Sequence, residues 1–203
     1  MKTPEAVVFD LGKVLVEFDW TRAAASLAPL ASANAAEIRH FLLETPSLYR
    51  YETGLLTTAE FFAEVQAGIG FRGDLAAFDP LFSNIFTPIT GMIELHGLLR
   101  QKGIPTYIFS NTNDLAINHI RANYPFFHHF DGYVLSYEHQ AMKPQTKLYE
   151  VVESVTGRSG PALAYLDDRP ENIATALTRG WHAILHETPE QSHAALRKAG
   201  LPV

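Results

Sequence analysis

Five short, continuous apolar runs restrict the fold of this chain more than any other feature of its sequence. Each run is bounded by polar residues, glycine or proline, and most of the runs are rich in β-branched or aromatic side chains. Runs of this kind indicate strands that are buried on both faces, as in parallel sheets. The five predicted strands cover residues 6–9, 106–109, 133–135, 162–166 and 183–185.

Segments with helical spacing of apolar residues lie between these runs. Residues 89–101 end just before Gly103, and residues 170–179 begin with Pro170 and end before Gly180. Proline at the start and glycine just past the end are typical of helices. Alternating strands and helices predict a doubly wound (Rossmann-like) α/β fold with a parallel sheet. In such sheets the ligand crevice lies beyond the carboxyl ends of the strands.

The stretch from residue 18 to residue 88 has a different pattern, with few strand signals and several helix starts. Asn34 precedes Glu37 by three residues, and Thr57 precedes Glu60 by the same spacing. This spacing fits the capping box, in which two side chains satisfy the free amides at a helix N-terminus. We therefore predict an α/β core at residues 1–17 and 89–203, with a helical cap at 18–88 inserted after the first strand.

Charge and composition exclude several classes of function. The net charge is −6, which disfavours nonspecific nucleic-acid binding because that needs clustered cations. There is no cysteine, so disulfides, thiolate metal sites and a cysteine nucleophile are excluded. No apolar run approaches the roughly 18 residues that a membrane span needs. We expect a cytoplasmic monomer or homodimer without a membrane or nucleic-acid partner.

Side chains that can take part in catalysis occur in four places, at or just after the ends of predicted strands. In chain order they are a carboxylate, a hydroxyl, a cation and a second acidic cluster. Phosphoryl transfer needs such a set: a nucleophile, hydrogen-bond donors to phosphate, and positive charge against developing negative charge. The motifs are Asp10-Leu11-Gly12, Ser110-Asn111-Thr112-Asn113, Met142-Lys143-Pro144 and Asp167-Asp168 with Asn172.

In order and spacing, these motifs resemble the haloacid dehalogenase (HAD) superfamily over the whole chain. Within the superfamily they look most like the bacterial phosphatases that act on glucose 1-phosphate. The resemblance implies a magnesium-dependent phosphomonoester hydrolase acting on a small phosphorylated metabolite. It also implies that substrate choice resides in the helical cap.

The resemblance assigns a role to each motif residue. Asp10 would attack phosphorus and form an aspartyl-phosphate. Mg²⁺ would be held by the Asp10 carboxylate, the Gly12 carbonyl and the Asp168 carboxylate, a set of oxygen ligands that suits this cation. Which of Asp167 and Asp168 touches the metal is left open by the motif, although its spacing from Asn172 favours Asp168.

The remaining motif residues would handle the phosphate and support the metal. Ser110 and the amide of Asn111 would bind the phosphoryl oxygens, and Lys143 would balance the charge between Asp10 and the phosphoryl group. Asp167 and Asn172 would position Lys143 and the metal-bound waters by hydrogen bonding to them.

One departure from the superfamily pattern concerns acid–base chemistry. Phosphatases of this type commonly carry a second Asp two residues after the nucleophile, where this chain has Gly12. Loss of a general acid or base typically slows a reaction about 10²–10⁴-fold. We expect a substrate whose leaving group needs little protonation, such as a sugar 1-phosphate. Glu17, Asp19 or a cap residue would then have to act as the base for hydrolysis of the aspartyl-phosphate. In the cap, Tyr49, Tyr51 and Glu52 are candidates to face the substrate.

Three other functions fit parts of the pattern. A dehalogenase would use the same Asp10 to displace halide from carbon, but it would not need the acidic pair Asp167-Asp168. A phosphotransferase would need the acid–base group that Gly12 lacks. A catalytically weak phosphate-ligand binder is the alternative that Gly12 favours most.

Overall fold

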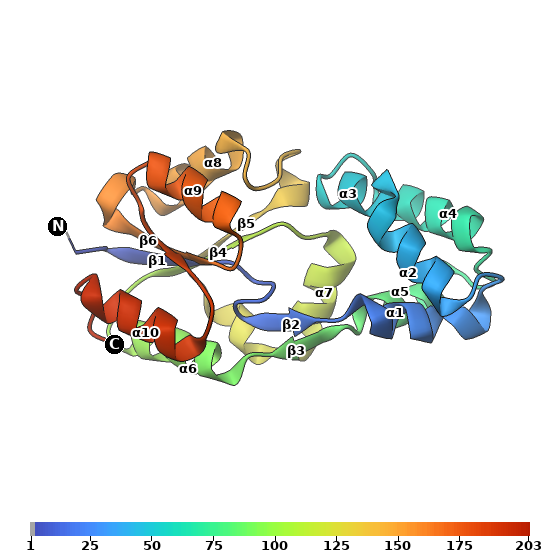
Figure 1. Ribbon diagram of the computed structural model, residues 1–203, viewed down its shortest axis with the longest axis horizontal. Helices are drawn as coiled ribbons and strands as arrows, with labels where there is room; N and C mark the ends of the chain where they lie inside the picture. The colour runs from blue at the N-terminus through green and yellow to red at the C-terminus, as the bar shows by residue number, and fades with distance from the viewer. Residues whose placement is uncertain (1–2) are drawn as a thin grey trace.

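The computed structural model describes residues 3–203 and contains a five-stranded sheet in the order β5-β4-β1-β6-β7 (Figure 1). All neighbouring pairs in this sheet are parallel. The doubly wound α/β fold predicted from the sequence is therefore confirmed, and each predicted strand lies within one or two residues of an observed one. The strands are β1 (Ala6–Phe9), β4 (Thr106–Ser110), β5 (Gly132–Leu135), β6 (Leu163–Asp167) and β7 (His182–Leu185).

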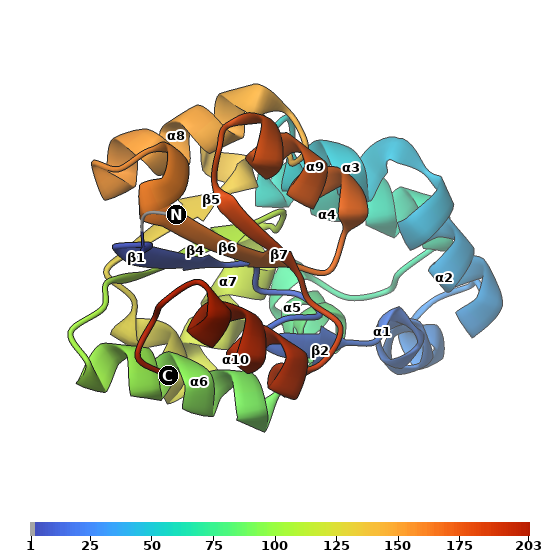
Figure 2. The ribbon, with the colours of Figure 1, turned by 60° about the vertical axis from the view of Figure 1, so that its left-hand side comes forward.

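Helices cover both faces of this sheet (Figure 2). Helices α6 (Thr90–Gln101), α7 (Asp114–Asn123) and α10 (Pro189–Lys198) pack on one face, and α8 (Thr146–Thr156) and α9 (Pro170–Thr178) pack on the other. Successive side chains of β1 alternate between the two apolar clusters: Val7 and Phe9 enter one, and Ala6 and Val8 enter the other. This burial on both faces explains why the strand is apolar without interruption.

Within residues 20–83, five α-helices form a second body beside the sheet. They surround their own apolar cluster, which is dominated by aromatic rings such as Phe61, Phe78 and Phe82. A two-stranded antiparallel ribbon, β2 (Val16–Phe18) with β3 (Phe86–Pro88), connects this body to the core. We call it the cap; its helices are α1 (Trp20–Leu27), α2 (Ala35–Glu44), α3 (Pro46–Glu52), α4 (Thr58–Ile69) and α5 (Leu75–Ser83).

The helix starts within the cap follow the sequence signals closely. Asn34 and Glu37 form a complete capping box at α2, and Thr57 and Glu60 form another at α4. Each box satisfies amides that a helix N-terminus otherwise leaves without partners. Among residues 3–203 there are also four short 3₁₀ helices: η1 (Ala28–Leu30), η2 (Pro125–His129), η3 (Ser136–Glu138) and η4 (Gly160–Ala162).

The expected boundaries between core and cap, at 17/18 and 88/89, lie within or at the end of the connecting ribbon. None of the helices in residues 3–203 combines the length and apolar character needed to cross a lipid bilayer.

Candidate active site

The sheet brings three of the four motifs to one edge. Phe9 of β1 is in register with Ile108 of β4 on one side and with Leu166 of β6 on the other. Asp10, Ser110 and Asp167 therefore end three adjacent parallel strands at nearly the same level. This is the strand edge at which doubly wound folds bind their ligands.

Lys143 supplies the fourth motif and joins two of these carboxylates. Its ammonium lies 2.9 Å from Asp10 Oδ1 and 2.7 Å from Asp167 Oδ2, and it donates to the Phe109 carbonyl at 2.9 Å. The lysine side chain is only 1% exposed. Burial alone would lower its pKa, but the charges of Asp10 and Asp167 outweigh this effect, so the pKa is raised and the lysine stays charged.

Asp167 is the most fully hydrogen-bonded of the acidic residues. Its carboxylate accepts bonds from Lys143, the Tyr165 hydroxyl, the Arg169 amide and the Asn172 side chain. Burial tends to raise its pKa, but the lysine charge and these donors prevail and hold the pKa below its usual range. Asp168, beside it, is partly buried, and desolvation together with the Asp167 charge raises its pKa.

Asp10 combines burial with nearby negative charge. Its Oδ1 atom faces Lys143 and accepts the Leu11 amide at 2.6 Å. Burial and the Asp167 charge raise its pKa to about 7, although Lys143 acts in the opposite direction. Oxygens of Asp10, Asp167 and Asp168 lie within 4.8 Å of one another, which concentrates negative charge in a way that a cation would relieve.

A small pocket of about 120 Å³ lies at this cluster, lined by Asp10, Gly12, Lys143, Asp168 and Asn172 among others. Within residues 3–203, Asn172 Oδ1 is buried and accepts no hydrogen bond, whereas its amide group donates to Asp167. A buried acceptor without a partner is unfavourable unless a water or ion ligand satisfies it. This acceptor and the all-oxygen donor set fit a hydrated Mg²⁺.

Ser110 and Asn111 reach the same edge from β4. Ser110 is buried, and it lines a larger cavity together with Asn111. The Asn111 side chain clamps the Lys143 backbone, donating to its carbonyl at 3.0 Å and accepting from its amide at 2.7 Å. The sequence motif predicted a role for the Asn111 amide but gave no sign of this second contact, which joins segments 32 residues apart.

At Gly12, an aromatic ring occupies the space beside the backbone. A β-carbon at this position would approach Phe18 Cε1 to 2.9 Å, so any side chain there would displace the ring. The two nearby acidic candidates for acid–base chemistry are engaged elsewhere. Glu17 forms an exposed ion pair with Lys13, and Asp19 caps α1 by accepting the Thr21 amide at 2.8 Å.

The cap contributes Glu52, and several contacts across the cap–core joint fix its position. Ser136 Oγ lies 2.5 Å from the Glu52 carbonyl and also bonds the Thr112 backbone. Gly54 adopts φ +74° and lies so close to the Tyr137 carbonyl that a β-carbon would approach that oxygen to 2.0 Å. No residue other than glycine fits there without moving the backbone.

Of the three cap residues considered from the sequence, Glu52 is the one that lines the larger cavity. Tyr51 is buried instead, stacked on Phe61 at 4.4 Å, with its hydroxyl bonded to Thr58 and to the Leu115 amide. Tyr49 is 52% exposed and lies outside the cavity lining.

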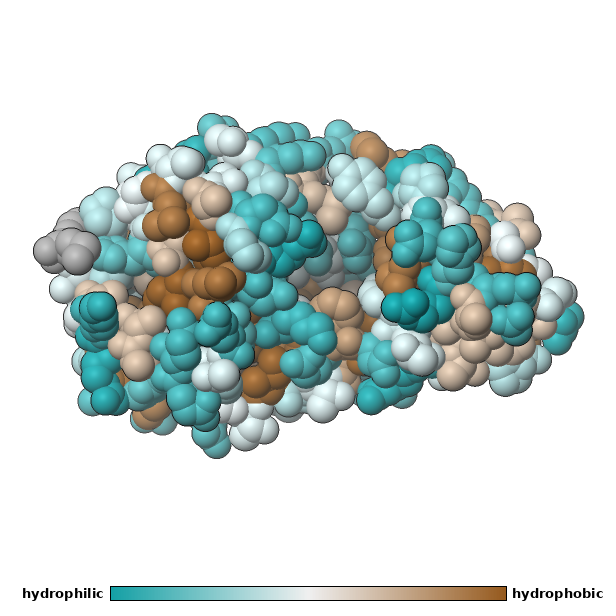
Figure 3. Space-filling model, in the orientation of Figure 1, coloured by the Kyte–Doolittle hydropathy of each residue, from teal (hydrophilic) through white to brown (hydrophobic). Residues whose placement is uncertain are grey.

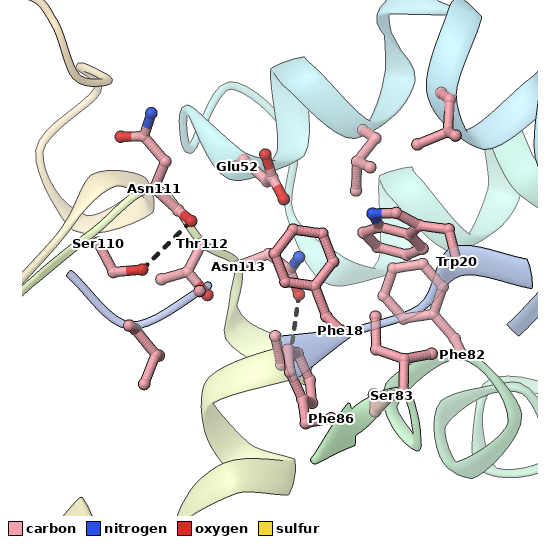
Figure 4. Close-up of a pocket in the computed structure, with 16 residues that line it drawn as sticks. Phe18, Trp20, Glu52, Phe82, Ser83, Phe86, Ser110, Asn111, Thr112 and Asn113 are labelled. Atoms are coloured by element: carbon pink, nitrogen blue, oxygen red, sulfur yellow. Dashed lines mark hydrogen bonds between the residues drawn. The ribbon is translucent and has the colours of Figure 1, made fainter. Parts of the chain in front are cut away.

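Glu52 is the charged residue among the described residues that line this cavity of about 260 Å³. Burial raises its pKa to about 7, and an interaction with the Asn113 side chain offsets part of the shift. Figure 4 shows its carboxylate between the polar edge of Ser110 and Thr112 and the rings of Phe18 and Trp20. The space-filling view shows the hollow between core and cap (Figure 3).

Comparisons with known proteins agree with this architecture. A sesquiterpene phosphatase, astK, from Aspergillus oryzae is 23% identical over 179 residues, covering 88% of this chain and 87% of its own. A HAD family enzyme from Bacteroides thetaiotaomicron, solved with magnesium and inorganic phosphate, has a TM-score of 0.80 at 23% identity and covers 91% of this chain and 94% of its own.

A predicted HAD-like family hydrolase from Porphyromonas gingivalis also has a TM-score of 0.80, at 20% identity, with 97% of this chain and 98% of its own covered. The family model of the haloacid dehalogenase-like hydrolases matches residues 4–178, which include all four strand-end motifs. The chain therefore belongs to the haloacid dehalogenase-like hydrolase family.

Proposed function

We propose that this protein is a Mg²⁺-dependent phosphomonoester hydrolase that works through an aspartyl-phosphate at Asp10. The observation that carries the proposal is the buried ammonium of Lys143, paired with Asp10 at 2.9 Å and with Asp167 at 2.7 Å. It keeps a carboxylate nucleophile in place and presents positive charge where an anionic ester would bind. A phosphatase among the relatives supports the same reaction.

Asp10, the Gly12 carbonyl and Asp168 would hold the metal. Asp167 is less suited because Lys143, Tyr165, Arg169 and Asn172 already occupy its oxygens. Bound Mg²⁺ would neutralise charge on the phosphate and reduce the repulsion among the carboxylates. Asn172 would accept a hydrogen bond from a metal-bound water through its free Oδ1.

In the reaction, an Asp10 oxygen bonds to phosphorus as the bond from phosphorus to the ester oxygen breaks. Ser110 and the Asn111 amide bind the phosphoryl oxygens, and Lys143 offsets the charge that develops on them. Water then attacks phosphorus, releases inorganic phosphate and restores the Asp10 carboxylate.

We assign the proton transfers to Glu52, since Gly12 has no side chain and Glu17 and Asp19 are engaged elsewhere. A carboxyl group with a pKa of about 7 can donate a proton to the leaving oxygen and later accept one from water. Both steps take place at the junction between the small pocket and the larger cavity, which share Gly12, Phe18 and Asn111.

The test is hydrolysis of p-nitrophenyl phosphate with and without Mg²⁺. We expect a measurable rate that excess chelator abolishes and that falls at least 10³-fold in Asp10→Asn, because the amide is not a nucleophile. Asp114→Asn, at the start of α7, is the matched control and should retain most of the activity.

Two results would contradict the proposal. Halide release from 2-chloropropionate that persists in chelator would favour a dehalogenase. Phosphate binding without turnover on any ester would favour a binder. The glucose 1-phosphate preference predicted from the resemblance is tested by including this ester in the same assay.

A further inference from the structure

The larger cavity has one polar end and one apolar end. Ser110, Asn111 and Thr112 lie at the polar end, and Glu52 lies between them and the rings of Phe18 and Trp20 (Figure 4). The polar end adjoins Asp10, because Asp10 follows β1, the neighbour of β4 in the sheet. Most of the remaining wall comes from the entry and exit of the cap and from α2 and α3. Its larger apolar members are Phe18, Trp20, Leu43, Leu48, Phe82, Ile85 and Phe86. Leu11 and Ala116 of the core also line the cavity.

Phe18, Trp20 and Phe82 of this wall form one run of contacting rings. Phe18 and Trp20 meet edge to face at 6.4 Å, and Trp20 lies 5.5 Å from Phe82. Ser83, a polar neighbour in the lining, donates its hydroxyl to Asp79 at 2.7 Å, and Asn113 Oδ1 accepts the Ala116 amide at 3.0 Å. Beyond the polar end, the main hydrogen-bonding groups that the wall offers a bound molecule are therefore Glu52 and the Asn113 side-chain amide, which interact with each other.

Such a wall discriminates between classes of organic group. A sugar hydroxyl placed against it loses its hydrogen bonds to water without gaining a partner, which is unfavourable. A hydrocarbon in the same place is stabilised because its apolar surface is removed from water. The volume of about 260 Å³ is slightly below the roughly 300–1,000 Å³ of pockets for drug-sized ligands.

We propose that this cavity binds the organic part of the substrate and that this part is predominantly apolar, a compact aryl, alicyclic or branched alkyl group. The inference rests on the proposed phosphatase activity, because Asp10 and Ser110 then fix the phosphate at the polar end. The ester oxygen lies at the junction, near Glu52, and the hydrocarbon extends past Phe18 toward Trp20 and Phe82.

A matched substrate pair tests the inference. Cyclohexylmethyl phosphate and glucose 6-phosphate are both esters of a primary alcohol next to a six-membered ring, and they differ chiefly in ring hydroxyls. We expect kcat/KM to be at least tenfold higher for the cyclohexyl ester, with glucose 1-phosphate also below it. Equal or higher kcat/KM for either sugar phosphate would overturn the inference and leave the proposed function intact.

Leu43→Asn places a polar group in the wall. Leu43 is partly buried and lines the cavity without belonging to the apolar cluster of the cap, so the variant should fold. We expect it to reduce the preference for the cyclohexyl ester about tenfold, since even one extra or missing methylene in an apolar pocket changes selectivity by about 10–200-fold. Leu30→Ser, a partly exposed cap leucine outside the cavity, is the control and should leave the preference unchanged.

A binding measurement separates this inference from the proposed function. Cyclohexylmethylphosphonate cannot be hydrolysed, so its affinity in the presence of Mg²⁺ can be measured by calorimetry whatever the activity of the protein. Affinity about tenfold weaker in Leu43→Asn than in the wild type supports the apolar subsite. Equal affinity in both proteins, or no binding to either, overturns it, even if p-nitrophenyl phosphate is hydrolysed.

Discussion

The carboxyl edge of the sheet and the interior of the cap are stabilised by opposite kinds of interaction. At the sheet edge, buried Lys143, Asp10 and Asp167 depend on one another for charge and hydrogen bonds. In the cap, Tyr51, Phe61, Phe78 and Phe82 pack as rings with little directional bonding between them. A charged network fails when one member is lost, whereas an apolar core tolerates change in proportion to the volume removed.

The largest effect is expected at Lys143. Lys143→Met leaves Asp10 and Asp167 buried without their cation, so the free energy of unfolding should fall by about 3–5 kcal/mol at pH 7 in urea titrations. Activity should fall at least a hundredfold. The control is Lys147→Met, whose ammonium bonds the His139 carbonyl at the exposed surface and whose loss should change stability by less than about 0.5 kcal/mol. Stability within 1 kcal/mol of the wild type would show that the network is not coupled as described.

The second effect tests whether the cap is an independent unit. Phe61→Ala removes a fully buried ring that stacks on Tyr51 at 4.4 Å, and should cost about 3–5 kcal/mol. Amide hydrogen exchange should then accelerate in α1 to α5 while β1, β4 and β6 keep their protection. Phe127→Ala, which empties a fully buried site in the core, should instead accelerate exchange in the sheet. Equal acceleration everywhere in Phe61→Ala would mean that cap and core unfold together.

The difference between the sheet edge and the cap also explains which parts of the fold and the site could be predicted from the sequence. Ser110 and Asp167 each end a buried strand and Asp10 directly follows one, so identifying the strands was enough to bring these side chains together. The ribbon of β2 and β3 was missed because strands of three residues show no usable period. Helix α7, which packs beneath β4, was not predicted either.

The position of Glu52 shows most clearly what could not be predicted from the sequence. Its sequence neighbourhood suggested only that it could face the substrate. Its position depends on Ser136, 84 residues away, and on the contact of Gly54 with the Tyr137 carbonyl. The filling of the space beside Gly12 by Phe18 is a shorter-range contact, between the loop after β1 and strand β2. The position of Glu52 does not follow from local spacing, because it requires the orientation of the cap over the sheet.

The smallest and most specific effect is expected at Glu52, where the cap contributes its charge to the site. If Glu52 protonates the leaving oxygen, Glu52→Gln should slow phosphoenzyme formation about 10²-fold for an alkyl phosphate. The loss should be less than tenfold for p-nitrophenyl phosphate, whose phenolate departs without a proton. Single-turnover kinetics measure this step directly. Glu44→Gln, an exposed carboxylate of α2, should slow neither ester, and an equal loss on both esters in Glu52→Gln would indicate a structural role.

The pKa of Glu52 also predicts the pH dependence of stability. Because folding raises this pKa from its usual 4.5 to about 7, the folded state binds the proton more tightly than the unfolded chain does. The contribution of Glu52 to stability is therefore largest below pH 4.5, falls as the pH rises to about 7, and is constant above that. Glu52→Gln removes this dependence, so relative to the wild type it should gain about 1–3 kcal/mol between pH 4 and pH 8 in urea titrations. A constant difference between the two proteins over this range would mean that the Glu52 carboxyl is hydrated like an ordinary surface glutamate, and the cap would then supply shape but no proton to the site.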